Sequence, residues 1–175
     1  MPKIATLVGC VLLVAGVTAQ APPTPASQKP AFPATDVTAA DIQKFIDALP
    51  KDAISDNPIR IVDVGNAHIG VYGVFRPKNS PQDAILHDTT TSEIYYMLEG
   101  SATLVTGGTI AGQGVGRASA TGTRGSRIDG GVSRHIGKGD VVIIPPRTPH
   151  WWTSLESDLR YLIFRPDPAS RSQLR

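Results

Sequence analysis

Two short stretches of the sequence combine histidine and glutamate side chains with apolar runs typical of β-strands. The first runs from His87 to Gly100 and contains Glu93; the second runs from Gly139 to His150. Side chains two residues apart on a strand point to the same face of the sheet. His87 and Glu93 are therefore expected to point to the same face, unless a bend in the intervening threonines changes the alternation. If the two stretches are neighbours, two imidazoles and one carboxylate converge, and this donor set binds divalent metals.

These stretches resemble the two motifs of the cupin superfamily, whose members fold as small antiparallel jelly-roll barrels. The first motif, G-x5-H-x-H-x3,4-E-x6-G, matches here at His87, Glu93 and Gly100. The second, G-x5-P-x-G-x2-H-x3-N, matches at Gly139 and His150. The resemblance implies a single-domain, cupin-2-like barrel in which His87, Glu93 and His150 are metal ligands and Glu93 could also move a proton.

The chain departs from these motifs at four positions. Thr89 stands where the family has a second histidine, Pro81 replaces the opening glycine, and Arg147 and Ser154 replace a glycine and an asparagine. Thr89 could leave a coordination position open to water, substrate or dioxygen, or it could weaken the site until no metal is held. Asp88 could serve as a substitute ligand if a local bulge turned it inward.

We predict one mononuclear site for a divalent transition metal. Neutral imidazole and carboxylate donors suit iron, manganese, zinc, nickel or copper, and the sequence does not choose among them. Two histidines and one carboxylate are also the ligand set of non-haem iron oxygenases. His68 and His135 lie on other expected strands, where a surface or core role is the simpler interpretation, and His68 is the better candidate for an extra ligand.

Other side chains near the expected ligands could form a substrate pocket. Tyr95 and Met97 share the parity of Glu93, and Trp152 shares that of His150, so these three could line an apolar pocket or simply fill the core. Arg147 follows a proline-rich turn beside the site, where its guanidinium could bind a carboxylate substrate.

The surrounding elements are those of an all-β domain with one leading helix. Residues 36–50 predict an amphipathic helix, because Thr38 begins a capping box and apolar side chains recur at helical spacing from Ile42 to Leu49, before Pro50. We expect it to pack outside the barrel or against a dimer partner. Short strands with glycine and proline turns are expected over residues 59–64, 68–75, 84–87, 93–98, 102–105, 134–136, 141–144 and 160–164.

The barrel is expected to span residues 55–168, and residues 107–131 interrupt its pattern. This inter-motif segment is rich in glycine, serine, threonine and alanine, with few apolar side chains. A loop of that length within a compact domain is usually functional or disordered. We expect either a flap at the barrel mouth or a disordered segment.

The N-terminus has the pattern of a secretory signal peptide over residues 1–19, followed by a proline-rich linker over residues 20–35. The apolar run is too short for a stable membrane span and leads to a small-residue cleavage site at Ala19. We therefore expect an exported protein, periplasmic or secreted. A lipobox-like sequence ending at Cys10 leaves lipidation as an alternative.

The amino-acid composition limits the classes of function that the protein can have. The formal charge of +2 is small and the arginines are scattered, which excludes nucleic acid as an expected partner. Cleavage after Ala19 would remove the one cysteine, and with it thiol chemistry. We expect a metalloenzyme of the oxygenase, isomerase or lyase type, acting on a small organic molecule and forming a homodimer by family resemblance. The alternative is a non-catalytic module that binds a small molecule or the metal.

Overall fold

The computed structural model describes residues 33–114 and 122–175. The expected signal peptide at residues 1–19 and most of the linker lie outside the described residues, and residues 33–35 have no regular secondary structure. The residues from Phe32 to Arg175 form one compact unit. Within the described ranges, no helix combines the length and the apolar character that crossing a membrane would require.

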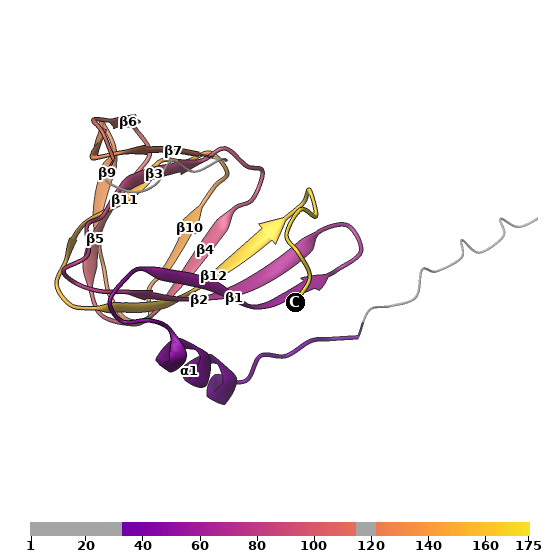
Figure 1. Cartoon of the computed structure of the whole chain (residues 1–175). Helices are drawn as coiled ribbons and strands as arrows, with labels where there is room; N and C mark the ends of the chain where they lie inside the picture. Colours follow the sequence, from indigo (N-terminus) through magenta and orange to yellow (C-terminus); the bar gives the residue numbers. More distant parts are fainter. Residues whose placement is uncertain (1–32, 115–121) are drawn as a thin grey trace, which may run out of the picture. The chain divides into compact units, whose positions relative to one another are not determined.

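One helix, α1 (Ala39–Ala48), precedes the strands. Its N-cap is Thr38, whose hydroxyl oxygen accepts a hydrogen bond from the Asp41 backbone N–H at 3.1 Å, so the expected cap is confirmed. Ile46 is buried, and it and Phe45 contact the strand β2 at Gly73, where the missing side chain makes room for the helix. The helix therefore packs on the outside of the barrel, one of the two placements expected (Figure 1).

Within the described residues, the strands form two five-stranded antiparallel sheets and a small ribbon (Figure 1). The first sheet has the order β1 (Ser55–Asp63), β2 (His68–Arg76), β12 (Leu159–Asp167), β4 (Glu93–Glu99) and β10 (Val141–Ile144). The second has the order β7 (Gly122–Gly125), β3 (Ala84–His87), β11 (His150–Leu155), β5 (Ala102–Thr106) and β9 (Val132–Ile136). The ribbon pairs β6 (Thr109–Ala111) with β8 (Arg127–Asp129). The prediction of an all-β antiparallel barrel with one helix is confirmed.

The two stretches that carry the expected ligands are neighbours, which was the condition for their convergence, but His87 and Glu93 do not share one regular strand. Strand β10 pairs with β4, so that Ile144 lies opposite Glu93. His87 ends β3 in one sheet, whereas Glu93 begins β4 in the other. The two side chains converge because the chain crosses between facing sheets at residues 88–92, and not because they share a strand.

The inter-motif segment contains more regular structure than expected. Its described part forms β6, β7 and β8, and β7 pairs with β3, which ends at the site residue His87. The alternative of a disordered segment was therefore wrong for residues 109–111, 122–125 and 127–129, whereas the alternative of a flap stays a prediction. Residues 115–121 lie outside the described residues. Strand β11, which begins at His150, was also absent from the expected strands.

The core lies between the two sheets. Large side chains from both sheets are fully buried there, among them Tyr161, Met97, Leu104, Leu159 and Val74. Burying each such side chain stabilises the fold by roughly 1.5 to 3 kcal/mol. The same layer continues into Tyr95 and Trp152, which stack with their ring centroids 6.2 Å apart and face the open end of the barrel.

Candidate metal centre

The structure brings together the three residues that the motifs singled out. His87 comes from the end of β3, Glu93 from the start of β4 and His150 from the start of β11. One donor atom from each residue lies within 4.8 Å of the other two. Glu93 and His150 are only 6% and 5% exposed, and His87 is partly buried. This is a compact cluster of two imidazoles and one carboxylate at the inner surface of the barrel.

His150 is held in an orientation suited to a ligand. Its Nδ1 lies 3.0 Å from the backbone carbonyl oxygen of Thr148. A carbonyl can only accept, so Nδ1 carries the hydrogen and the lone pair of Nε2 points at the site, 3.6 Å from Glu93 Oε2. Burial lowers the pKa of His150, although the Glu93 charge opposes the shift. Burial lowers the pKa of His87 in the same way.

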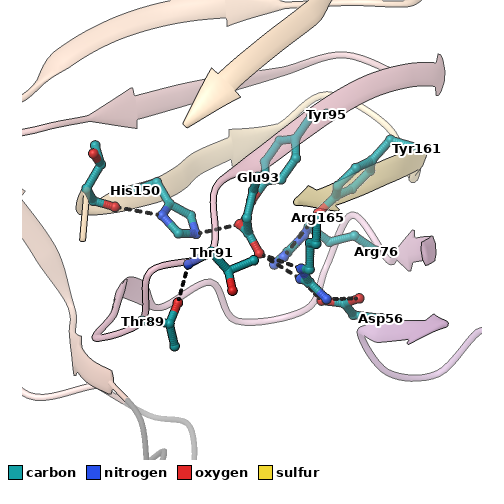
Figure 2. Close-up of polar contacts among 10 residues, drawn as sticks. Asp56, Arg76, Thr89, Thr91, Glu93, Tyr95, His150, Tyr161 and Arg165 are labelled. Carbon is teal, nitrogen blue, oxygen red and sulfur yellow. Dashed lines mark hydrogen bonds and ion pairs between the residues drawn. The ribbon is translucent and has the colours of Figure 1, made fainter. Parts of the chain in front are cut away.

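Glu93 is fixed by partners on both carboxylate oxygens. Arg165 donates to Oε1 from Nε at 2.8 Å, and the Tyr95 hydroxyl donates to Oε2 at 2.9 Å (Figure 2). Burial alone would raise the pKa of Glu93, but the Arg165 charge and the other site groups more than offset this and hold it below its usual value. Burial, together with the neighbouring Glu93 charge, raises the pKa of Tyr95.

Arg165 is itself fixed by further contacts. It donates to both carboxylate oxygens of Asp56, at 3.1 and 2.6 Å (Figure 2). Its guanidinium carbon lies 4.3 Å from the ring centroid of Tyr72. Burial works against its charge, but Asp56 and Glu93 raise the pKa of Arg165 above its usual value. Arg165 therefore keeps its charge, and its contacts with Asp56 and Glu93 hold the Glu93 carboxylate in place.

The donor set fits a divalent transition metal. With metal–ligand bonds of about 2.1 Å, two ligands of one metal lie roughly 3 to 4 Å apart, which is the separation of His150 Nε2 and Glu93 Oε2. Oε2 accepts one hydrogen bond from Tyr95 and retains a second lone pair. Both imidazoles favour the neutral form that a metal requires.

The extra ligands considered from sequence do not join the triad. His68 Nδ1 lies 2.7 Å from the carbonyl oxygen of Ser172, at the opposite end of β2 from Arg76. Thr89 accepts a hydrogen bond from the Thr91 backbone and lines a separate small cavity. Asp88 is exposed and forms an ion pair with Arg147. Within the residues the structure describes, the cluster has three members.

Arg147 lies beside the triad, as expected, but its guanidinium is paired with Asp88. Its Nε donates to Asp88 at 2.8 Å, and its side chain is 67% exposed. It borders a crevice of about 10 Å³ beside the triad and does not line the larger cavity of about 650 Å³. Its backbone has a φ of 57°, the left-handed region in which the family motif has glycine.

A cavity of about 650 Å³ opens beside the triad. Tyr95 and Trp152 form part of its wall, as the parity argument anticipated, whereas Met97 is 1% exposed and packs deeper in the core. The cavity is also lined by charged and polar side chains that the sequence did not single out: Asp56, Arg76, Asp83, Arg124, Tyr161 and Arg165. Strand alternation offered a signal for Arg165, which shares the parity of the inward-facing Tyr161.

No protein-family model matches the chain, and no curated protein matches it. Solved structures do resemble it. Protein BH2720 from Bacillus halodurans has a TM-score of 0.50 at 10% identity, over 82% of this chain and 88% of that one. An RmlC-like cupin from Desulfovibrio desulfuricans has a TM-score of 0.44 at 14% identity, over 69% of this chain and 90% of that one.

An RmlC-like cupin family protein with a double-stranded β-helix fold, from Methanocaldococcus jannaschii, has a TM-score of 0.41 at 13% identity, over 69% of this chain and 89% of that one. At these identities the similarity concerns the fold. The two facing antiparallel sheets form the jelly-roll barrel that the motif resemblance predicted. A His-His-Glu cluster within that fold fits a metal-binding cupin.

Proposed function

We propose that the protein binds one divalent transition metal through His87, Glu93 and His150 and transforms a small organic molecule in the adjoining cavity. The observation that carries this proposal is the position of the triad: its three donor atoms lie within 4.8 Å of one another and its residues line a cavity of about 650 Å³. Pockets for small molecules commonly have this size. Iron, manganese, zinc, nickel and copper all suit the donor set.

A metal bound here would supply Lewis acidity or a place for dioxygen to bind. The protein residues provide orientation and shielding. Thr148 sets the tautomer of His150, and Arg165 keeps Glu93 ionised and in place. Because the pKa of Tyr95 is raised, its hydroxyl keeps its proton and remains a donor to Glu93. Glu93 would therefore act as a ligand and proton acceptor, not as an acid.

We propose an oxygenase, isomerase or lyase type of reaction, with the oxygenase type favoured by the two-histidine, one-carboxylate donor set. The test is to load the protein with each candidate metal and to measure oxygen uptake and product formation with phenols and 1,3-dicarbonyl compounds. Turnover that is lost in Glu93→Gln, while the metal is retained at least in part, supports the enzyme. Metal-loaded protein that leaves every compound unchanged contradicts it.

One observation favours a non-catalytic binding module as the second candidate. Both carboxylate oxygens of Glu93 already have protein partners, Arg165 on Oε1 and Tyr95 on Oε2. In addition, Thr89 stands where the motif has a further histidine. These features would suit a site that holds a ligand or a metal without turning it over. Ligand binding without turnover under all metal loadings would support this alternative.

We also propose that the protein is exported and forms a homodimer. The proposal of export depends on the signal-peptide pattern of residues 1–19, and its test is the N-terminal sequence of protein recovered from the periplasm or medium, expected to begin at Gln20. The dimer is supported by exposed apolar side chains on the outer face of the edge strand β10, Val141 and Ile143, next to Tyr96 on β4. A contiguous apolar patch of this kind suits a protein contact.

A further inference from the structure

Three buried donor atoms around the cavity have no hydrogen-bond partner. Among the described residues, the buried side-chain nitrogens and oxygens without a partner are Arg76 Nε, Arg124 Nε and Trp152 Nε1. All three residues line the cavity beside the triad. Trp152 is 3% exposed, so its indole N–H is shielded from solvent as well as lacking a protein acceptor. Leaving a buried donor unpaired costs roughly 1 to 3 kcal/mol, which favours a ligand that brings acceptor oxygens.

Among the described arginines that line the cavity, Arg76 alone has no ion-pair partner within those residues. Arg165 is paired with Asp56 and Glu93, and Arg124 Nη1 lies 3.5 Å from Asp83 Oδ2. Among the described residues that line the cavity, three arginines and three carboxylates cancel in formal charge, so a bound divalent cation would leave this set at +2. That excess favours an anionic ligand.

Arg76 contacts neutral groups only. Its Nη2 donates to the Tyr161 hydroxyl at 3.4 Å (Figure 2). Its Nη1 donates to the side-chain oxygen of Gln82. Within the described ranges, no carboxylate lies within ion-pair distance of its guanidinium. Nε is buried without a partner, and each Nη has a second hydrogen beyond the one used in these bonds. A guanidinium offers two parallel N–H groups that match the geometry of a carboxylate.

The rest of the cavity wall suits a carbon skeleton. The stacked rings of Tyr95 and Trp152, together with Ile85 and Ile163, provide apolar surface between the charged groups. At about 650 Å³ the cavity is much larger than an inorganic anion requires. An aromatic or similarly apolar body would fill it while an acceptor oxygen reaches the indole N–H of Trp152.

We propose that the cavity binds a small organic acid with an apolar body, its carboxylate held by Arg76 and an acceptor oxygen held by Trp152. This inference rests on the proposed function, since it names the substrate class of the same site. Arg76 is thereby a substrate-binding residue, and the metal triad lies next to the bound acid.

The test is a binding titration with defined probes: benzoate, phenylpyruvate, the neutral analogue benzamide, and inorganic phosphate. The only two tryptophans, Trp151 and Trp152, both line the cavity, so their fluorescence reports occupancy directly and calorimetry provides an independent affinity. Full-length wild type is compared with Arg76→Met and Arg76→Lys, in metal-free and metal-loaded forms. Arg134→Met is the matched control, because Arg134 is exposed and bonds to Thr106 on the other sheet.

Wild type should bind both acids and should bind benzamide at least about tenfold more weakly, the factor that corresponds to one charge-assisted contact. Arg76→Met should weaken acid binding by about tenfold or more, Arg76→Lys by less, and Arg134→Met by no more than about twofold. Trp152→Phe keeps the ring but removes the donor, and it should weaken the binding of both acids several-fold. Circular dichroism verifies that each variant is folded.

Other outcomes overturn the inference. It fails if folded Arg76→Met binds the acids as wild type does, if benzamide binds as well as benzoate, or if neither acid binds wild type in either form. Phosphate binding as tightly as the acids would indicate an inorganic-anion site instead. Metal content measured on the same samples separates the two proposals. If the protein contains the metal but its acid binding does not depend on Arg76, only this inference is refuted. If acid binding depends on Arg76 but the protein contains no metal, only the metal centre is refuted.

Discussion

Arg165 on β12 connects Glu93 of the metal triad to Asp56 on β1 of the same sheet, and its removal should be costly. Its side chain is 17% exposed and bonds to both Glu93 and Asp56. Arg165→Met would leave the Glu93 carboxylate buried beside Tyr95 without its main charge partner. Breaking a buried pair from one side typically costs about 3 to 5 kcal/mol. We expect a loss of about 3 kcal/mol in the free energy of unfolding, measured by urea denaturation.

The matched control for that change is Arg160→Met. Arg160 also lies on β12 and forms an ion pair with Glu99, but both side chains are partly or largely exposed. Exposed pairs contribute only about 0 to 1 kcal/mol. If the two variants lose the same small amount of stability, the network around Glu93 does not have the role assigned to it.

The pH dependence of metal binding should follow the two imidazoles. Burial lowers the pKa values of His87 and His150 below the usual 6.5, so both are neutral near pH 7 and no proton must leave before a metal binds. As the pH falls through these lowered values, protons compete and affinity decreases. Calorimetry in buffers of different ionisation enthalpy should detect almost no proton release near pH 7 and increasing release at lower pH. Release of about two protons at pH 7 would contradict neutral imidazoles.

At the same residue scale, part of the site was predictable. His87, Glu93 and His150 follow from motif spacing alone, because residue type and position in two short stretches identify them. Arg165 shares its parity with the inward-facing Tyr161, so alternation along one strand could have found it. Its pairing with Asp56 could not be predicted, since the contact joins strands 109 positions apart in sequence.

Among the elements, the turn at Gly100 should be the least tolerant of a side chain. Gly100 closes the first motif with a φ of 86°, and a β-carbon there would lie 2.2 Å from the backbone oxygen of Asp158. Gly139 has a similar φ of 88° but open space around it. Left-handed backbone costs a residue with a β-carbon roughly 1 to 2 kcal/mol, and the clash adds to this at Gly100 only.

Gly139→Ala should therefore lose about 1 kcal/mol, and Gly100→Ala clearly more, as measured by the shift of the urea midpoint at constant m-value. The two substitutions are matched in chemistry and in backbone angle, so the difference isolates the steric contact. Equal losses would show that the turn at Gly100 moves away from Asp158 at little cost.

The expected strands were correct where the sequence has many apolar residues, and strands were missed where it has few. Strand β4 and strand β10 have continuous apolar character, and their positions were predicted closely. Strands β7 and β8 consist of Gly122–Gly125 and Arg127–Asp129, which have little intrinsic strand preference. Their strand conformation comes from pairing with β3 and β6, which is tertiary information that a local pattern does not contain.

At the scale of the whole molecule, the outer face of β10 should mediate self-association. Ile143 is 69% exposed, and Val141 and Tyr96 lie beside it on the same outer surface. Ile143→Lys would place a charge in an apolar contact and should convert a dimer to a monomer in light scattering. Val132→Lys is the control, because Val132 is also exposed but lies on β9 in the other sheet. A wild-type monomer, or a dimer that both variants retain, would refute this interface.

The proposed function depends on a metal bound by His87, Glu93 and His150, and elemental analysis tests for that metal most directly. Protein purified without chelator or polyhistidine tag is measured beside His87→Ala, His150→Ala and the control His135→Ala, whose exposed ring instead pairs with Glu156. We predict close to one transition-metal ion per chain in wild type and in His135→Ala, and loss of the metal in both triad variants. Wild-type protein that remains metal-free after reconstitution with each candidate metal, or metal that persists in both triad variants, would contradict the central claim.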